Sequence, residues 1–399
     1  MHIFKTDSRN DFNEKRSEKY FMSNYMAAFG LRLPHMDTVN EVLKALDNNE
    51  LEKMKDDMIS MIIERKILNL YRIASKYHQV VFDATGTVSI NEANVKNFPN
   101  AVTTTSKNGV ITYHLKVLEA KIVTSSGLVI SIGTEWIENE GEYHKQDCEL
   151  KAFVRLSEKL KKRFPRLPIC AVADGLYPNK TTFDICKKNS WKYIFTFKDG
   201  NLKTVWDDIN GLKQLESRNI KETVVAVKRR KKVDNGMLQV ITRKTTVYSW
   251  INNLSYGEND FNYVEMIETE NDNLPHKFAY ISNFDIDENN ICEIAERGRL
   301  RFKIENEGFN TQKNLGYGIT HKFSRTSMNA VKNYYTCIQM AHLLNQLFEH
   351  RADVQALIIG RQTMKNFWHF IVGHFCFEDL TENFKNIDVQ KKAKIRLAG

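Results

Sequence analysis

The chain has 399 residues and a modest positive excess, with 58 Lys and Arg against 49 Asp and Glu and a net charge of +9. Its six cysteines form no Cys-x-x-Cys pair, so neither a zinc site nor a disulfide framework is indicated, and a reducing, cytoplasmic setting follows most simply. The N-terminal stretch lacks the apolar core of a signal peptide, and the apolar run FWHFIVGHFCF is too short for a bilayer, which needs about 20 residues. We therefore expect no membrane partner, while the charge suits a polyanion.

The first 75 residues are predicted to be helical. Thr38 and Glu41 have the spacing of a capping box, which would open one helix, and a second helix is expected over residues 52–76. Because single hydrophobic cores stop growing well below this chain length, two or three subdomains are expected.

The next part of the chain reads as a sheet followed by a helix. A strand is expected over residues 79–84, and the alternating stretches 112–123 and 128–137 are expected to supply antiparallel neighbours. A helix is predicted over residues 146–164, with apolar side chains on one face. These side chains are Phe153, Leu156, Leu160 and Phe164.

A strand that ends at Asp174, a helix over 181–189 and a strand over 193–198 predict a parallel crossover. The pattern then changes to strands between residues 201 and 284. In this block two β-rich runs flank Asp234, Asn235 and Gly236, and Asn-Gly between such runs is a strong hairpin signal.

Three acids are candidate metal ligands. Asp83 ends the apolar run in VVFDAT, Asp174 ends the run in PICAVADG, and Glu305 lies in the charged stretch RGRLRFKIENEGFNTQKN. Acids held by rigid elements could bind Mg²⁺, which prefers oxygen ligands and suits phosphodiester chemistry. By spacing alone, each Asp is more often a strand cap or a turn residue.

The sequence segments around these acids resemble those of a known protein family. VVFDATG, YHLKVLEAKIV, ADGLYPNK, YIFTFK and RFKIENEGFN occur in the order seen in the catalytic domain of bacterial insertion-sequence transposases of the DDE class, and the resemblance covers about residues 77–342. One branch of this family has the signature Tyr-x2-Arg-x3-Glu-x6-Lys. Arg301 and Glu305 fit it, whereas Gly298 stands at the Tyr position, and Gln312 stands at the Lys position with Lys313 following it.

The resemblance implies an α/β, RNase H-like fold with a mixed sheet flanked by helices, a β-rich insertion and a helical N-terminal region. It implies a catalytic and metal-binding triad of Asp83, Asp174 and Glu305 that holds two Mg²⁺ ions, for which Mn²⁺ can substitute. Asp83 is expected to bridge the metals. Arg301 could contact a phosphate or only pair with Glu305.

Further DNA contacts are expected from the lysine next to the signature position, from a basic run and from a tryptophan. The basic run is more often a solvated face, and burial in the core is the safer interpretation of the tryptophan. These residues are Lys313, Lys228, Arg229, Arg230 and Trp250. A uniform helix would place Glu305 on an apolar stripe with Ile294, Gly298, Arg301, Phe302 and Phe309. Glu307 would then pair with Lys303 in water, so Glu305 is the expected catalytic acid.

The resemblance predicts a transposase that cleaves transposon ends and joins them to target DNA, with double-stranded DNA (terminal inverted repeats and target) as partner and a homodimer on paired ends. The alternatives are an RNase H-like nuclease without strand transfer and an inactive DNA-binding relic. Five regions are expected: a helical N-terminal region (1–75), the first part of the catalytic domain (76–200), the β-rich insertion (201–284), the completed catalytic domain (285–350) and a helical C-terminal region (351–399). The N-terminal region is either a head that binds the DNA ends, part of which could be missing, or a helical packing unit.

Overall fold

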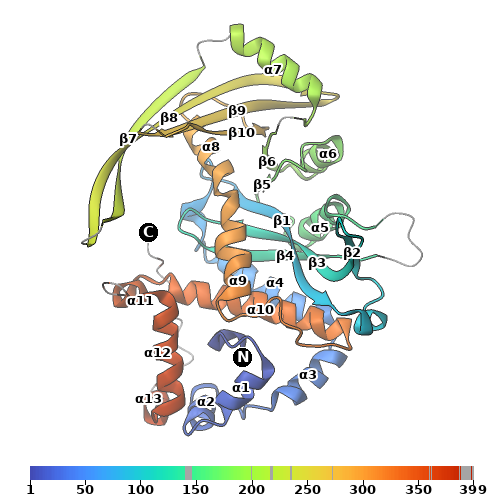
Figure 1. The fold of residues 1–399 in the computed structure, drawn as a ribbon, viewed down its shortest axis with the longest axis vertical. Helices are drawn as coiled ribbons and strands as arrows, with labels where there is room; N and C mark the ends of the chain where they lie inside the picture. Colours follow the sequence, from blue (N-terminus) through green and yellow to red (C-terminus); the bar gives the residue numbers. More distant parts are fainter. Residues whose placement is uncertain are drawn as a thin grey trace. The chain divides into compact units, whose positions relative to one another are not determined.

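The computed structural model describes residues 1–139, 146–198, 200–215, 219–233, 236–271, 273–358, 360, 362–385, 387 and 397. Its architecture is mixed α/β, with a ten-stranded mixed sheet and flanking helices, so the predicted fold class is confirmed at this level (Figure 1). Two compact units divide the chain, and each is built from separate stretches of sequence. Strand β1 (His78–Ile90) has residues in both units.

The first unit comprises Met1–Leu68, Ala84–Leu156 and Lys303–Gly399. Its helices are α1 (Arg9–Arg16), α2 (Phe21–Phe29), α3 (Met36–Ala45), α4 (Asn48–Glu64), α9 (Thr311–Asn314), α10 (Met328–Glu349), α11 (Ala352–Leu357), α12 (Met364–Phe377) and α13 (Thr381–Lys385), with the short helices η1 (His2–Phe4) and η3 (Glu92–Asn97) and the π-helix η5 (Ile304–Asn310). Its strands β2 (Val102–Thr105), β3 (Ile111–Val123) and β4 (Val129–Ile137) are antiparallel: β2 and β4 both pair with β3.

The N-terminal helices share one apolar core with the C-terminal helices. Phe12 of α1 and Phe21 of α2 pack edge to face with ring centroids 5.7 Å apart, and Phe21 also meets Phe375 of α12 at 5.1 Å. Tyr334 and Ile338 of α10 belong to the same buried cluster. The first and last helices of the chain are therefore parts of one packing unit.

The second unit comprises Asn69–Asp83 and Ser157–Phe302. Its elements are η2 (Asn69–Tyr71), β5 (Ile169–Ala173), α6 (Lys180–Asn189), β6 (Lys192–Thr196), α7 (Lys203–Leu215), β7 (Ile220–Val233), β8 (Gly236–Tyr256), β9 (Asn259–Glu270), β10 (His276–Ser282), α8 (Ile291–Arg299) and η4 (Leu300–Phe302). Helix α5 (Glu149–Arg163) begins in the first unit and ends in the second.

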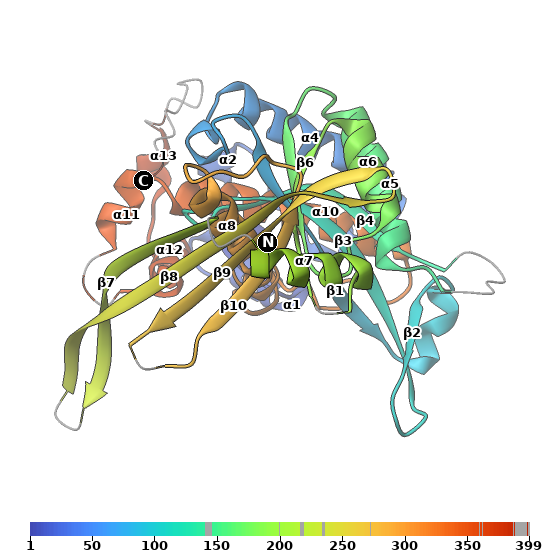
Figure 2. The same ribbon diagram turned by 90° about the horizontal axis from the view of Figure 1, so that it is seen from above.

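The strands of the second unit form one continuous ladder. Strand β5 pairs in parallel with both β1 and β6, which confirms the predicted crossover, and β6 pairs antiparallel with β10. Strands β10, β9, β8 and β7 then follow as an antiparallel meander, seen side by side in both views (Figures 1 and 2). The predicted β-rich block therefore extends the sheet through β10.

Local packing explains these elements. The first five residues of β1 are buried, as are all five of β5, because a parallel strand in the middle of a sheet is covered on both faces. Phe153, Leu156, Leu160 and Phe164 are all buried, so the predicted face of α5 is confirmed.

Several predicted boundaries are wrong. Helix α3 begins at Met36 and its N-cap is His35, whose ring accepts a hydrogen bond from the backbone of Asp37, so Thr38 lies inside the helix. Helix α4 ends at Glu64, well before residue 76. The β-rich block opens with helix α7, because apolar residues recur there with helical spacing.

The predicted hairpin joins β7 and β8, in which Val233 pairs with Gly236, while Asp234 and Asn235 lie outside the described residues. In the part of the chain that the structure describes, no helix combines the length and the apolar character that a membrane span needs.

Candidate functional site

Two parallel strands bring Asp83 and Asp174 together. Val81 of β1 pairs with Val172 of β5, and each aspartate follows its valine by two residues. Because side chains on a strand alternate between faces, both carboxylates leave the sheet on the same side as the paired valines, with about 4.8 Å between the strands. Asp174 directly follows the end of β5, as predicted, whereas the strand expected over 79–84 continues to Ile90, so Asp83 lies inside β1 and not at its end.

Asp174 stands at the first step of a tight turn. Its Oδ1 accepts a hydrogen bond of 2.8 Å from the backbone N–H of Leu176, the local turn typical of Asp after a strand. The next residue, Gly175, lies so close to the stem of Lys198 that an added Cβ would stand 3.0 Å from it. The chain therefore holds the cationic Lys198 beside the residue that follows Asp174.

Asp83 lies beside a guanidinium. Nη1 of Arg301 is 3.8 Å from Oδ2 of Asp83, and the two side chains are 24% and 19% exposed. A half-buried pair of this kind contributes up to about 1 kcal/mol. The predicted phosphate ligand Arg301 is thus placed next to one of the two predicted metal ligands.

Arg301 and Lys198 line one cavity of about 480 Å³ in the second unit. Its walls carry four cationic side chains, several aromatic rings and, among the residues that the structure describes, no acid. The lining residues are Thr196, Phe197, Lys198, Trp206, Lys277, Phe278, Ala279, Tyr280, Gly298, Arg299, Arg301 and Phe302. Of these only Arg301 was predicted from the sequence to contact DNA, although the stretch RGRLR also contains Arg299.

Gly298 explains how one ring reaches this cavity. A Cβ at Gly298 would stand 2.7 Å from the ring of Tyr280, a distance that no side chain tolerates. The glycine that replaces the signature tyrosine therefore leaves room for a tyrosine from strand β10. No sequence motif indicated Tyr280.

The helix around Glu305 is irregular, so the face predicted for it is wrong. Helix α8 ends at Arg299, a 3₁₀ turn and then the π-helix η5 follow, and each changes the number of residues per turn. The buried residues of η5 are Ile304, Gly308 and Phe309, whereas Glu305 is exposed. Phe302, predicted on the same buried stripe, is 41% exposed.

Glu307 behaves as expected. Its Oε1 accepts a hydrogen bond of 2.9 Å from Nζ of Lys303, four residues earlier. The two side chains are 36% and 16% exposed, so the pair is worth less than about 1 kcal/mol. Glu305 and Glu307 thus differ in their surroundings, and Glu305 stays the predicted catalytic acid.

Gln312, at the signature's Lys position, is fully buried in a polar network of the first unit. Its Oε1 accepts a hydrogen bond of 3.2 Å from Nζ of Lys121, which also donates to Gln339 at 3.2 Å. Burial lowers the pKa of Lys121 to about 8, while Glu119, with its carboxylate 4.0 Å away, raises it. The buried ammonium of Lys121 therefore lies beside Gln312, the residue at the signature's Lys position.

The same network fixes a neutral histidine. The side-chain amides of Gln312 and Gln346 lie 3.0 and 3.1 Å from Nδ1 of His342, which therefore acts as an acceptor. Burial lowers the pKa of His342 well below its ordinary value, and the nearby Lys121 lowers it further. His342 is thus uncharged at neutral pH.

The remaining predicted DNA contacts lie elsewhere. Lys228 is exposed on β7, while the side chains of Arg229 and Arg230 lie outside the described part of the chain. Trp250 on β8 is 8% exposed, which fits a structural role. Lys313 is half-buried on α9.

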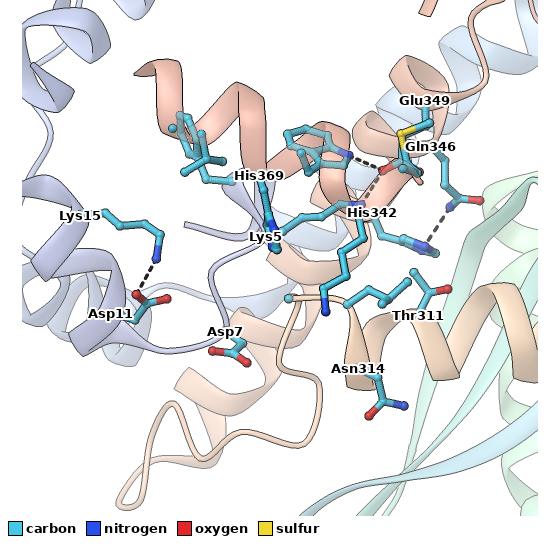
Figure 3. A pocket seen from close by; sticks show the side chains of 18 of the residues that line it. Lys5, Asp7, Asp11, Lys15, Thr311, Asn314, His342, Gln346, Glu349 and His369 are labelled. Atoms are coloured by element: carbon cyan, nitrogen blue, oxygen red, sulfur yellow. Dashed lines mark hydrogen bonds and ion pairs between the residues drawn. The ribbon is translucent and has the colours of Figure 1, made fainter. Parts of the chain in front are cut away.

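A larger cavity, of about 720 Å³, lies in the first unit between α1, α10 and α12 (Figure 3). Two of its lysines pair with acids: Lys15 donates to Asp11, and Lys5 donates to Glu349 at 2.6 Å. None of the predicted site residues is among the described residues that line it. Its paired charges make it less suited to a polyanion than the cavity of the second unit.

Among the described residues, no three His, Cys, Asp or Glu side chains come close enough together to hold a metal ion. Asp83 and Asp174 therefore belong to no such group of three, although each carries carboxylate oxygens, the ligand type that Mg²⁺ prefers.

No protein-family model matches the chain, and no curated protein matches it in sequence. Its fold is similar to that in a cryo-EM structure of the piggyBac transposase synaptic complex with hairpin DNA, with a TM-score of 0.37 and 10% sequence identity. The match covers 79% of this chain and 55% of that chain, so this chain spans about half the length of the structure it matches.

Proposed function

We propose that the chain is a DNA transposase that cleaves transposon ends and joins them to target DNA by two-metal phosphodiester chemistry. The observation that carries the proposal is that Asp83 and Asp174 each follow, by two residues, the paired Val81 and Val172 of two parallel strands, with Arg301 beside Asp83. Two carboxylates side by side repel each other, so their pairing costs stability unless a cation joins them. The resemblance of the segments around these acids to DDE transposases supports DNA cleavage and strand transfer as the reaction of this pair.

The donor set fits Mg²⁺. Asp83 and Asp174 would hold the ions from the sheet, and Glu305 is the proposed third ligand. When bound, Mg²⁺ would supply Lewis-acid polarisation of the phosphate and charge stabilisation of the oxygens that attack and leave. Arg301, 3.8 Å from Asp83, is placed to neutralise a phosphate oxygen next to the reacting group.

The reaction then has two displacements at phosphorus. In the first, a water oxygen bonds to phosphorus and gives up a proton, the bond to the 3′ oxygen breaks, and that oxygen takes up a proton to become a free 3′-hydroxyl. In the second, the freed 3′-hydroxyl attacks a phosphodiester of the target, loses its proton and releases the target's own 3′ oxygen. Neither displacement consumes an oxidant or a nucleotide cofactor.

The test is cleavage and joining by the full chain with Mg²⁺. The substrate is a labelled duplex that carries the ends of the element encoding the chain, with a supercoiled plasmid as target. We expect Asp83→Asn and Asp174→Asn each to lower cleavage by at least about 100-fold, because a charged oxygen ligand is lost at nearly constant volume. The matched control is Asp184→Asn, an exposed carboxylate of the same unit that pairs with Lys180.

Each outcome separates two functions. Cleavage with joined products supports the transposase, whereas cleavage without joined products identifies a nuclease. Absence of cleavage by the unaltered chain, with DNA binding retained, identifies a non-catalytic DNA-binding protein. Cleavage within tenfold of the unaltered chain in either Asn variant removes that residue from the metal site.

A further inference from the structure

We propose that the 480 Å³ cavity of the second unit is a subsite for a backbone phosphate of the bound nucleic-acid strand, read without regard to base, with Arg299, Lys277, Lys198 and the Tyr280 hydroxyl as its ligands. The inference rests on the proposed function for the identity of the strand. It assigns a role to four residues that neither the sequence signature nor the acidic pair includes.

Two of the cations lie over aromatic rings. The guanidinium of Arg299 lies 4.3 Å from the ring centroid of Phe278, and Nζ of Lys277 lies 6.0 Å from that of Trp206. A cation over a ring face gains up to about 2 kcal/mol and loses side-chain freedom. These charges are therefore held at the cavity before a ligand arrives.

Two glutamates that do not line the cavity hold these cations in position without fully neutralising their charge. Glu268 pairs with Arg299 at 3.4 Å and also with Lys244, while Glu265 pairs with Lys277 at 2.6 Å and also with Lys213. Both glutamates are only 9% exposed. Each acid is thus shared by two cations, so each group retains an excess positive charge.

The same contacts argue against base stacking. One face of Trp206 stacks on Phe197 with centroids 4.8 Å apart, and Lys277 lies on its ring as well. Arg299 covers Phe278. A base needs an open ring face, and at Trp206 and Phe278 a face is already covered. The cavity therefore offers charge and hydrogen-bond donors, which suit a phosphate.

Tyr280 adds an uncharged donor. Tyr280 is 3% exposed, and its hydroxyl makes no hydrogen bond within the described part of the chain. Burial raises the pKa of Tyr280, with opposing effects from the nearby Arg299 and Arg301, so the hydroxyl keeps its proton. A neutral hydroxyl beside two guanidinium groups can donate to a phosphate oxygen that both cations attract.

The experiment measures binding of the full chain to a 20-bp duplex of random sequence by fluorescence anisotropy, in EDTA, across a salt series. We expect Arg299→Gln to weaken binding about tenfold and to reduce the slope of log K against log salt by about 0.9, the value for one lost phosphate contact. Arg299→Lys should keep the slope. The matched control is Lys244→Gln, because Lys244 shares Glu268 but does not line the cavity.

Tyr280→Phe should weaken binding several-fold at every salt concentration with the slope unchanged, because a neutral hydroxyl releases no counterion. Unchanged melting temperatures separate these effects from misfolding. The proposal is overturned if Arg299→Gln keeps the slope, if Lys244→Gln loses as much of it, or if the loss is confined to either an A·T-only or a G·C-only duplex. Cleavage is measured separately in Mg²⁺, so a chain that never cleaves can still show the slope change, and a chain that cleaves can lack it.

Discussion

The buried ammonium of Lys121 makes folding stability depend on pH in a predictable direction. Its side chain is fully buried, and its pKa falls from an ordinary 10.5 to about 8 because burial disfavours the charged form. Between these pH values the unfolded chain holds a proton that the folded chain has lost. Stability therefore rises with pH through this window, and the difference corresponds to about 3 kcal/mol.

Lys121→Met isolates this contribution. The variant also removes a donor to Gln312 and Gln339, so its stability at one pH combines several effects. The change with pH is simpler, because cysteines and tyrosines that titrate in the same range are common to both proteins. We expect the free energy of unfolding of the unaltered chain, minus that of the variant, to rise by up to about 3 kcal/mol from pH 7.5 to pH 10.5.

Urea unfolding at several pH values measures this difference, with Lys121→Gln as a second variant that retains hydrogen-bonding capacity. A flat difference curve would refute the reasoning, since it would mean that folded Lys121 titrates as it does in the unfolded chain. A curve that falls with pH would show that the ammonium is stabilised by its partners, with Glu119 at 4.0 Å as the dominant neighbour.

Three further outcomes are expected. Gly298→Ala should lower the free energy of unfolding by about 1–3 kcal/mol, because its Cβ would stand 2.7 Å from a tyrosine ring, whereas Gly211→Ala, in open space on a helix, should raise it by about 0.5–1 kcal/mol in urea unfolding. In the cleavage assay Glu305→Gln should abolish activity and Glu307→Gln should cost little, and the reverse pattern would assign the catalytic acid to Glu307. Because the pKa of His342 is lowered, this residue should contribute a fall in stability below pH 6.5 of up to about 1.4 kcal/mol per pH unit, and His342→Gln should reduce the slope of acid titrations by that share, while His2 and His78, whose pKa values are also lowered, keep theirs.

The sequence predicted the elements that depend on local apolar patterns. Asp83 and Asp174 end runs of β-forming residues, and parallel pairing of those runs sets the two acids side by side. The helix before Asp174 was predicted because its apolar residues recur with helical spacing, and those residues are buried. The positions of these strands and of this helix follow from local periodicity, whereas the parallel pairing follows from the order of the elements.

Features that depend on distant partners were not predictable. The π-helix around Glu305 changes the facing of its side chains, and no periodicity in the sequence indicates where a helix adds a residue to a turn. Tyr280 reaches its cavity because Gly298, 18 residues later on another element, carries no side chain. Gln312 finds its partner Lys121 across 191 positions of the sequence. These contacts are set by tertiary packing, which a single sequence does not display.

Helix α10 also protects the edge of a sheet. Strand β4 pairs with β3 on one side, and the amide of Gln346 binds the backbone of Val129 on β4, accepting from its N–H at 2.7 Å and donating to its C=O at 2.8 Å. A side chain thus takes the hydrogen bonds that an added strand would form. Open strand edges invite pairing with other chains, so this contact guards the protein against aggregation through β4.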